Sequence, residues 1–413
     1  MTVEVRPLGV KCNIQCTYCY QDPIRRAQDA VPQYDLEAIK AAVDAEGSMF
    51  TIFGGEPLMV PLSDLENLWA WGFERFGQNA IQTNGTLIRP AHVEIFRKYN
   101  VHVGISVDGP DELNAARRAG SDVTTRRATA KTMRGIKMLC DAGLAPGIIV
   151  TLHRLNATAQ RLPRMNAWLR ELDEWGVRSV RLHALEVDAE IVRESLTLDP
   201  AELLFALDNF KALQPELKHI NFDVFGDVGR LQKGSDAKTT CIWNACDPYT
   251  TRAVRGIEGS GQRSNCGRTN KDGVEFSKAD TPGFERYIAL YFTPQEHGGC
   301  GGCRFFVLCK GQCPGTAIDG DWRNRSEHCE IWKSLFTQAE AQEAAQGGEA
   351  ISLQSTRELV ESVFLECWRA GWTPRLADVL SQANHAPELS AAALSRRVAK
   401  YGGRIIEADH QSV

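Results

Sequence analysis

Residues 3–19 read VEVRPLGVKCNIQCTYC and place a short β-branched run directly before three closely spaced cysteines. The run Val3–Arg6 is typical of a buried strand, so Cys12, Cys16 and Cys19 are expected on the loop at its C-terminal end. In barrels of parallel strands, that end is the active-site face. Three thiolates at this unequal spacing can hold three corners of a cubane iron–sulfur cluster and leave its fourth iron open to a substrate or cofactor.

Two plainer interpretations of these cysteines remain. A zinc site usually has a fourth Cys or His nearby and paired C-x2-C spacing, and buried cysteines can be small apolar residues only. Neither interpretation accounts for the polar motifs that follow the next strands.

Alternating strand and helix patterns continue through the first half of the chain, which is typical of parallel strands joined by helical crossovers. The expected strands are Val3–Arg6, Met49–Phe53, Ala80–Thr83, Val101–Val107, Gly147–Leu152 and Ser179–Ala184. Helices are expected near Leu36–Ala45, Leu62–Phe76, Ala91–Tyr99, Thr125–Ala142, Leu162–Trp175 and, as a connection, Ala201–Leu213. Six strand–helix units are too few for an eightfold barrel and predict an open, partial one.

Bulk composition narrows the class of protein. The chain has 413 residues and a net charge of −5, which gives no electrostatic case for a nucleic-acid partner. It has no apolar run of about 18 residues and no signal-peptide pattern, so we expect a cytoplasmic protein without a membrane partner. The cytoplasm keeps thiols reduced, so most of the thirteen cysteines are expected to bind metal clusters.

The C-x3-C-x2-C spacing with Tyr18 before the last cysteine resembles the motif of the radical S-adenosylmethionine (SAM) superfamily. Residues 54–57, Gly-Gly-Glu-Pro, resemble that family's loop for the methionine ammonium group, and polar residues end the next two strands. The resemblance implies SAM contacts from Tyr18, Gly54, Gly55, Glu56, Gln82, Asn84, Ser106 and Asp108. Asn84 and Asp108 are also common in plain turns. A cation for the SAM carboxylate could come from Arg117, Arg118, Arg126 or Arg127, although such residues usually form a solvated helix face.

Eight further cysteines follow between residues 241 and 329, and seven of them resemble the SPASM domain of peptide-modifying radical enzymes. The resemblance implies two auxiliary [4Fe–4S] clusters, fully bound by protein. One would be held by Cys241, Cys246, Cys266 and Cys313, and the other by Cys300, Cys303, Cys309 and Cys329. Such clusters would hold this Gly-rich part together in place of a large core. Cys140 and Cys367 are expected to be buried small residues.

The expected fold is therefore α/β. A partial (β/α)6 TIM-type barrel spans residues 1–235, a small cysteine-rich SPASM domain with two auxiliary clusters spans 236–335, and a C-terminal helical extension spans 336–413. The expected cofactors are SAM and three [4Fe–4S] clusters, of which the one at Cys12 has an open site.

The resemblance implies an enzyme that cleaves SAM to a 5′-deoxyadenosyl radical and abstracts hydrogen from a ribosomally made peptide, forming an oxidative product such as a cross-link. A flavodoxin or ferredoxin would supply electrons. Sulfatase maturases are the nearest alternative, but they have a general-base aspartate where Gly267 and Arg268 stand here. We assign no other catalytic residue. Two alternatives to an enzyme also remain. The chain could be an iron–sulfur protein that only transfers electrons, or a binding module stabilised by zinc.

The C-terminal region has an apolar stripe at helical spacing that includes Val360, Val363, Phe364 and Trp368. The stripe could pack on the barrel or close its open edge, or part of it could form a docking surface for the substrate's leader or a partner protein. We expect no leader-binding domain before the barrel, because the first strand begins near Met1.

Overall fold

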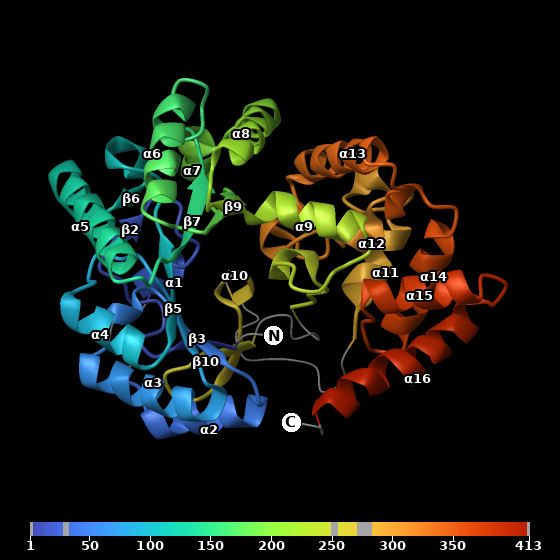
Figure 1. The fold of residues 1–413 in the computed structure, drawn as a ribbon, viewed down its shortest axis with the longest axis horizontal. Coiled ribbons are helices and arrows are strands. Elements are labelled where there is room, and N and C mark those ends of the chain that lie inside the picture. The colour runs from blue at the N-terminus through green and yellow to red at the C-terminus, as the bar shows by residue number, and fades with distance from the viewer. Residues whose placement is uncertain (1–2, 28–32, 249–254, 271–282, 411–413) are drawn as a thin grey trace. The chain divides into compact units, whose positions relative to one another are not determined.

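The computed structural model describes residues 3–27, 33–248, 255–270 and 283–410 (Figure 1). The chain forms two compact units. The first contains Met1–Val224 and Val254–Ser277, and the second contains Phe225–Ala253 and Lys278–Val413. Within the described ranges, no helix is both long and apolar enough to cross a membrane.

The first unit is built on a mostly parallel sheet. Its central strands are neighbours in chain order: β1 (Val3–Arg6), β3 (Phe50–Ile52), β4 (Asn79–Thr83), β5 (Val101–Ser106), β7 (Gly147–Leu152) and β8 (Ser179–Ala184). All six pair in parallel, which confirms the predicted strands and the α/β class. Because parallel strands place their C-terminal ends together, the loops after these strands lie at one edge of the sheet.

Helices separate these strands as predicted and line the outside of the sheet in Figure 1. They are α2 (Leu36–Glu46), α3 (Leu62–Phe76), α4 (Pro90–Lys98), α5 (Asp122–Asp141), α6 (Leu162–Glu174) and α8 (Pro200–Leu213). Helix α2 shows how local chemistry sets such boundaries. The Asp35 carboxylate accepts from the N–H groups of Glu37 and Ala38 at its start, and Gly47 ends it in a left-handed conformation.

Three short strands of this sheet were not predicted from the sequence. Strand β9 (Asn221–Phe222) pairs with β8, β10 (Arg255–Glu258) pairs in parallel with β1, and β11 (Arg263–Asn265) is antiparallel to β10. These segments have no apolar alternation to mark them. The buried Arg6 side chain links β10 and β11 to the first strand instead, because it donates to the Glu258 carboxylate at 3.0 Å and to the Asn265 carbonyl at 2.8 Å.

The second unit has an apolar core of aromatic side chains, which the sequence analysis did not expect. Trp243 contacts Phe336 of α13 (Cys329–Ala345) with ring centroids 5.5 Å apart. Tyr287 of α11 (Glu285–Phe292) stacks on Trp368 of α14 (Arg357–Arg369) at 4.9 Å. Cluster ligands are therefore not the only groups available to hold this unit together.

The C-terminal apolar stripe belongs to this core. Val360, Val363, Phe364 and Trp368 of α14 are each no more than 1% exposed, and α14 packs against α11 and α12 (Phe306–Cys309). Helix α15 (Leu376–His385) is buried through Leu376 and Val379 in the same way. The stripe therefore belongs to the core of the second unit, and these side chains are not available as a docking surface.

Candidate radical SAM site

The cysteine loop follows β1 and is fixed by a short strand pair. Strand β2 (Gln15–Cys16) pairs with β6 (Arg117–Arg118), which places Cys16 opposite Arg117. The Thr17 N–H donates to the Ala116 carbonyl at 2.8 Å and extends this attachment. The loop is thus joined to the segment that follows β5.

The three thiols lie close enough to affect one another. Burial raises the pKa of Cys16 to about 12, and the charges of Cys19 and Cys12 add to this effect. Burial also raises the pKa of Cys12. Two N–H groups lie near the sulfurs: Asn84 Nδ2 is 3.8 Å from the Cys12 sulfur, and Arg25 Nη2 is 3.2 Å from the Cys19 sulfur.

The donor set fits a cluster better than a single ion. In a cubane, each thiolate binds a different iron, so the sulfurs need not converge on one point. In the described part of the chain, no three Cys, His, Asp or Glu side chains are grouped closely enough to hold one metal ion. A mononuclear zinc site therefore gains no support.

Gly54 and Gly55, which follow β3, let two loops approach. A Cβ on Gly55 would lie 2.2 Å from the Lys11 carbonyl oxygen, and one on Gly54 would lie 2.5 Å from that of Gly9. The Gly55 N–H donates to the Gly9 carbonyl at 3.0 Å, and the Glu56 N–H donates to the Lys11 carbonyl at 2.8 Å. The glycines thus seat the cysteine loop against the end of β3.

The Glu56 carboxylate is buried and already hydrogen-bonded within the protein. It accepts from the Thr83 hydroxyl at 2.6 Å and from the backbone N–H groups of Asn84 at 2.8 Å and Leu58 at 3.0 Å. Burial raises its pKa, although these hydrogen bonds oppose the shift. In this arrangement Glu56 fixes the loop after β4, which carries Asn84.

The polar residues of the next two strand ends also lie together. Gln82 Nε2 donates to the Ser106 hydroxyl at 2.8 Å across β4 and β5. A Cβ on Gly104 would lie 2.1 Å from the Gln82 side-chain oxygen, so the bare backbone at Gly104 makes room for this side chain. Asn84 reaches the cysteine loop, where it donates to the Asn13 side chain at 2.8 Å.

Asp108 is the centre of a buried polar cluster. Its carboxylate accepts from Arg117 at 3.1 Å, from the Thr151 N–H at 3.0 Å and from the Tyr18 hydroxyl, and it lies 3.3 Å from His153 Nε2. Burial opposes ionisation, but the Arg117 guanidinium and the hydrogen bonds from His153 and Tyr18 hold the pKa of Asp108 well below its usual range. Asp108 thereby connects the aromatic residue of the cysteine motif to the ends of β5 and β7.

Of the four candidate arginines, the structure brings only Arg117 into this cluster. Arg118, Arg126 and Arg127 are exposed, as expected of a solvated face. Arg117 is 9% exposed and lies over the Tyr18 ring, 5.7 Å from its centroid.

Sequence reasoning missed His153 and Arg25. His153 follows β7 and is fully buried beside Asp108, and its place directly after a predicted strand is the signal that could have found it. Arg25 lies on α1 (Asp22–Ala27), six residues after Cys19, where no periodic pattern marks it.

Arg268 occupies the region in which sulfatase maturases have their aspartate, and its contacts fall within the first unit. Its guanidinium lies 2.6 Å from the carboxylate of Glu186, which follows β8. It also lies 2.7 Å from Nδ1 of His183, near the end of β8. Burial and the charge of Arg268 hold the pKa of His183 well below its usual value.

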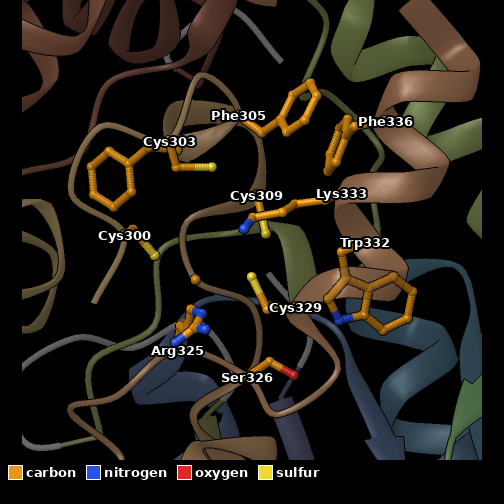
Figure 2. Close-up of a pocket in the computed structure, with 12 residues that line it drawn as sticks. Cys300, Cys303, Phe305, Cys309, Arg325, Ser326, Cys329, Trp332, Lys333 and Phe336 are labelled. Atoms are coloured by element: carbon orange, nitrogen blue, oxygen red, sulfur yellow. The ribbon is translucent and has the colours of Figure 1, made fainter. Parts of the chain in front are cut away.

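The second unit brings together the four cysteines assigned to one auxiliary cluster. Cys300, Cys303, Cys309 and Cys329 line a single pocket, and Figure 2 shows their sulfur atoms turned toward a common space. Burial raises the pKa of Cys300 to about 12, with further contributions from Cys303 and Cys329. This convergent thiol set, of which Cys300 is buried and the other three are half-buried, fits a four-cysteine cluster.

The other predicted ligand set is divided between the two units. Cys241, Cys246 and Cys313 lie in the second unit and Cys266 lies in the first, so their common cluster stays a prediction. Tyr287 holds the Cys246 backbone by donating to its carbonyl at 3.0 Å. Of the remaining two cysteines, Cys367 is buried and Cys140 is half-buried.

Comparison with known proteins finds relatives of part of the first unit. Residues 7–158 match the model of the radical SAM superfamily. A serine-type anaerobic sulfatase-maturating enzyme of Bacteroides thetaiotaomicron is 32% identical over 170 residues, which cover 38% of this chain and 40% of that protein. A cysteine-type enzyme of Clostridium novyi is 28% identical over 365 residues, 81% of this chain and 94% of the relative. These matches confirm the resemblance inferred from the cysteine motif.

Solved structures agree in fold. Native anSMEcpe with bound AdoMet and Cp18Cys peptide has a TM-score of 0.61 and 18% identity, over 83% of this chain and 97% of that one. Streptococcus suis SuiB bound to precursor peptide SuiA has a TM-score of 0.51 and 16% identity, over 80% and 76% of the two chains. The chain spans only about two fifths of the length of the first curated relatives that it matches.

Proposed function

Because residues 7–158 match the model of the radical SAM superfamily, we propose that this chain is a radical SAM enzyme that oxidatively modifies a residue of a ribosomally made peptide. The observation that carries the proposal is the cysteine loop. Cys12, Cys16 and Cys19 lie on one loop at the C-terminal ends of parallel strands, with N–H donors from Asn84 and Arg25 directed at two of the sulfurs.

Cys12, Cys16 and Cys19 would hold a [4Fe–4S] cluster. When bound, this cluster and SAM supply the one-electron cleavage that yields methionine and a 5′-deoxyadenosyl radical. The chain's own residues have positioning roles. Asn84 and Arg25 stabilise ligating thiolates, Gly54 and Gly55 seat the loop, and Asp108 fixes Tyr18 and Arg117 beside Cys16.

Gln82 and Ser106 lie at strand ends, and Tyr18 lies on the cysteine loop itself. These are the residues that we propose contact SAM, together with Asn84 and the Gly54–Gly55 backbone. In this proposal Glu56 and Asp108 act through their neighbours, because their carboxylates already accept hydrogen bonds within the protein. Tyr18 packs against a buried apolar cluster that includes Ala116 and Leu185, which would exclude water on its side of the loop.

Two auxiliary clusters complete the proposal. Cys300, Cys303, Cys309 and Cys329 would hold one, and Cys241, Cys246, Cys266 and Cys313 the other. The chemistry of fully ligated clusters is electron transfer, so they would remove the second electron from a substrate radical and give a net two-electron oxidation. A flavodoxin or ferredoxin would reduce the cluster at Cys12.

Formylglycine formation is the second candidate, since the curated relatives are sulfatase maturases. That reaction uses a general base, whereas the chain has Gly267 and Arg268 after Cys266. Arg268 stays protonated in proteins and is engaged by Glu186 and His183, so it does not accept a proton. This difference favours a peptide cross-link or dehydrogenation.

Mass spectrometry on two peptides tests the proposal. Anaerobically reconstituted protein, SAM and dithionite are incubated with the short peptide encoded beside its gene, or with a sulfatase-derived peptide containing Cys or Ser. We expect 5′-deoxyadenosine in both reactions and loss of two hydrogens only from the neighbouring peptide. Conversion of the sulfatase peptide to formylglycine would favour the second candidate, and absence of 5′-deoxyadenosine would refute both.

A further inference from the structure

The pocket of Cys300, Cys303, Cys309 and Cys329 is lined by nitrogen donors as well as by sulfur. Arg325, Trp332 and Lys333 contribute to its wall, and Figure 2 shows their side chains around the space that the four sulfur atoms face. No carboxylate lines this pocket. All these residues belong to the second unit.

One helix supplies two of the donors together with a ligand. Cys329 is the first residue of α13, and Trp332 and Lys333 follow it at i+3 and i+4. Residues at this spacing share one helix face, so the indole and ammonium groups are presented to the pocket on the same side as the Cys329 sulfur.

Two of the donors have no acceptor in the described protein. Arg325 Nε and Trp332 Nε1 are buried, and in the described residues no acceptor lies within hydrogen-bonding distance of either. The Arg325 backbone is fixed, because its N–H donates to Gly298 at 2.8 Å and its carbonyl accepts from Ile318 at 3.0 Å. A buried N–H without an acceptor costs free energy, which favours an acceptor inside the pocket.

We propose that Arg325 Nε–H and Trp332 Nε1–H donate to the sulfur atoms of the cluster that we assign to these four cysteines, and that Lys333 adds a third, cationic neighbour. The inference rests on the proposed function. Lys333 has the smallest effect of the three, since its ammonium group is shared with Gln295 at 2.7 Å and Glu330 at 3.2 Å.

The consequence is a raised reduction potential for this cluster. Reduction adds negative charge, which N–H donors and nearby cations stabilise more in the reduced state than in the oxidised state. The cluster would thereby become a better electron acceptor, which suits the proposed transfer of an electron from the substrate radical to the cluster.

Voltammetry on the full-length reconstituted protein tests this inference. Trp332→Phe removes only the indole N–H, and Arg325→Gln removes the guanidinium. Each is expected to lower the equilibrium constant for one-electron reduction of one cluster by about tenfold, which corresponds to 59 mV, with the other waves unchanged. Lys333→Gln is expected to shift the same wave by less.

Matched controls come from the same unit. Trp243→Phe removes the N–H of the neighbouring indole, whose ring lies 5.7 Å from that of Trp332 but does not line the pocket. Arg323→Gln removes an exposed cation that pairs with Asp321. Neither control is expected to shift a wave.

Shifts in Trp332→Phe and Arg325→Gln no larger than in these controls would overturn the inference. If Arg325→Gln loses iron, Trp332→Phe alone decides the question. A Cys300→Ala variant that keeps every redox wave and all its iron would instead refute the cluster assignment, so failure of the proposed function is recognised separately.

Discussion

Asp108 shows how one buried side chain can connect several residues of a site. From its sequence context it is a turn residue or a SAM contact, yet its carboxylate is fully buried among Arg117, His153 and Tyr18. The sequence predicts that this residue lies at the strand end. It does not predict its partners, because those depend on which loops pack against β5.

Replacement of Asp108 by Asn tests this role. The variant leaves the buried Arg117 without its counter-ion, so we expect a loss of about 3–5 kcal/mol in the free energy of unfolding, measured by urea denaturation at neutral pH. Asp111→Asn is the control, since Asp111 forms an exposed pair with Arg164 and is expected to change stability by less than about 1 kcal/mol. Equal losses in the two variants would contradict the assignment.

Acid should affect the wild type and Asp108→Asn differently. The pKa of Asp108 is lowered on folding, so its contribution to stability is present above its unfolded pKa of about 3.9 and is lost as the pH falls through the folded pKa. We therefore expect the stability difference between the two proteins to shrink below about pH 4. A difference that stays constant to lower pH would show that Asp108 is not ionised in the fold.

At the scale of elements, the site depends on close approach between the loops after β1 and β3. Gly55→Ala would place a Cβ within 2.2 Å of the Lys11 carbonyl, so the cysteine loop must move. We expect the reconstituted variant to fall from about twelve irons to about eight and to lose SAM cleavage. Gly147→Ala is the control, because nothing lies within 4 Å of its added Cβ. Full iron content in Gly55→Ala would refute this role of the glycine.

Helix α14 provides the element-scale test of the second unit. Phe364 is fully buried and packs against Trp368 at 5.3 Å. Phe364→Ala is expected to destabilise this unit by about 3–5 kcal/mol in thermal or urea unfolding. Leu353→Ala, at a side chain 53% exposed, should be nearly neutral. A neutral Phe364→Ala would restore the possibility that the stripe serves a partner.

At the scale of the whole molecule, the sequence predicts the repeated part of the fold and misses its edges. Strands such as Gly147–Leu152 were found because β-branched runs between amphipathic helices have a clear period. Strands β10 and β11 have no such period. They are linked to β1 by the buried Arg6, whose charge gives no sign in the sequence that it is buried. The resemblance to the SPASM domain implies a common site for Cys300 and its three partners, but the donors Arg325 and Trp332 are found only in the structure.

The central claim is that the loop of Cys12, Cys16 and Cys19 holds the cluster that cleaves SAM. The most direct measurement is the amount of 5′-deoxyadenosine formed from SAM and dithionite by the reconstituted triple variant Cys12→Ala, Cys16→Ala, Cys19→Ala, compared with wild type and with Cys140→Ala. We predict product from the wild type and the Cys140→Ala control, and none from the triple variant, which should still bind about eight irons. A triple variant that still forms 5′-deoxyadenosine would contradict the account.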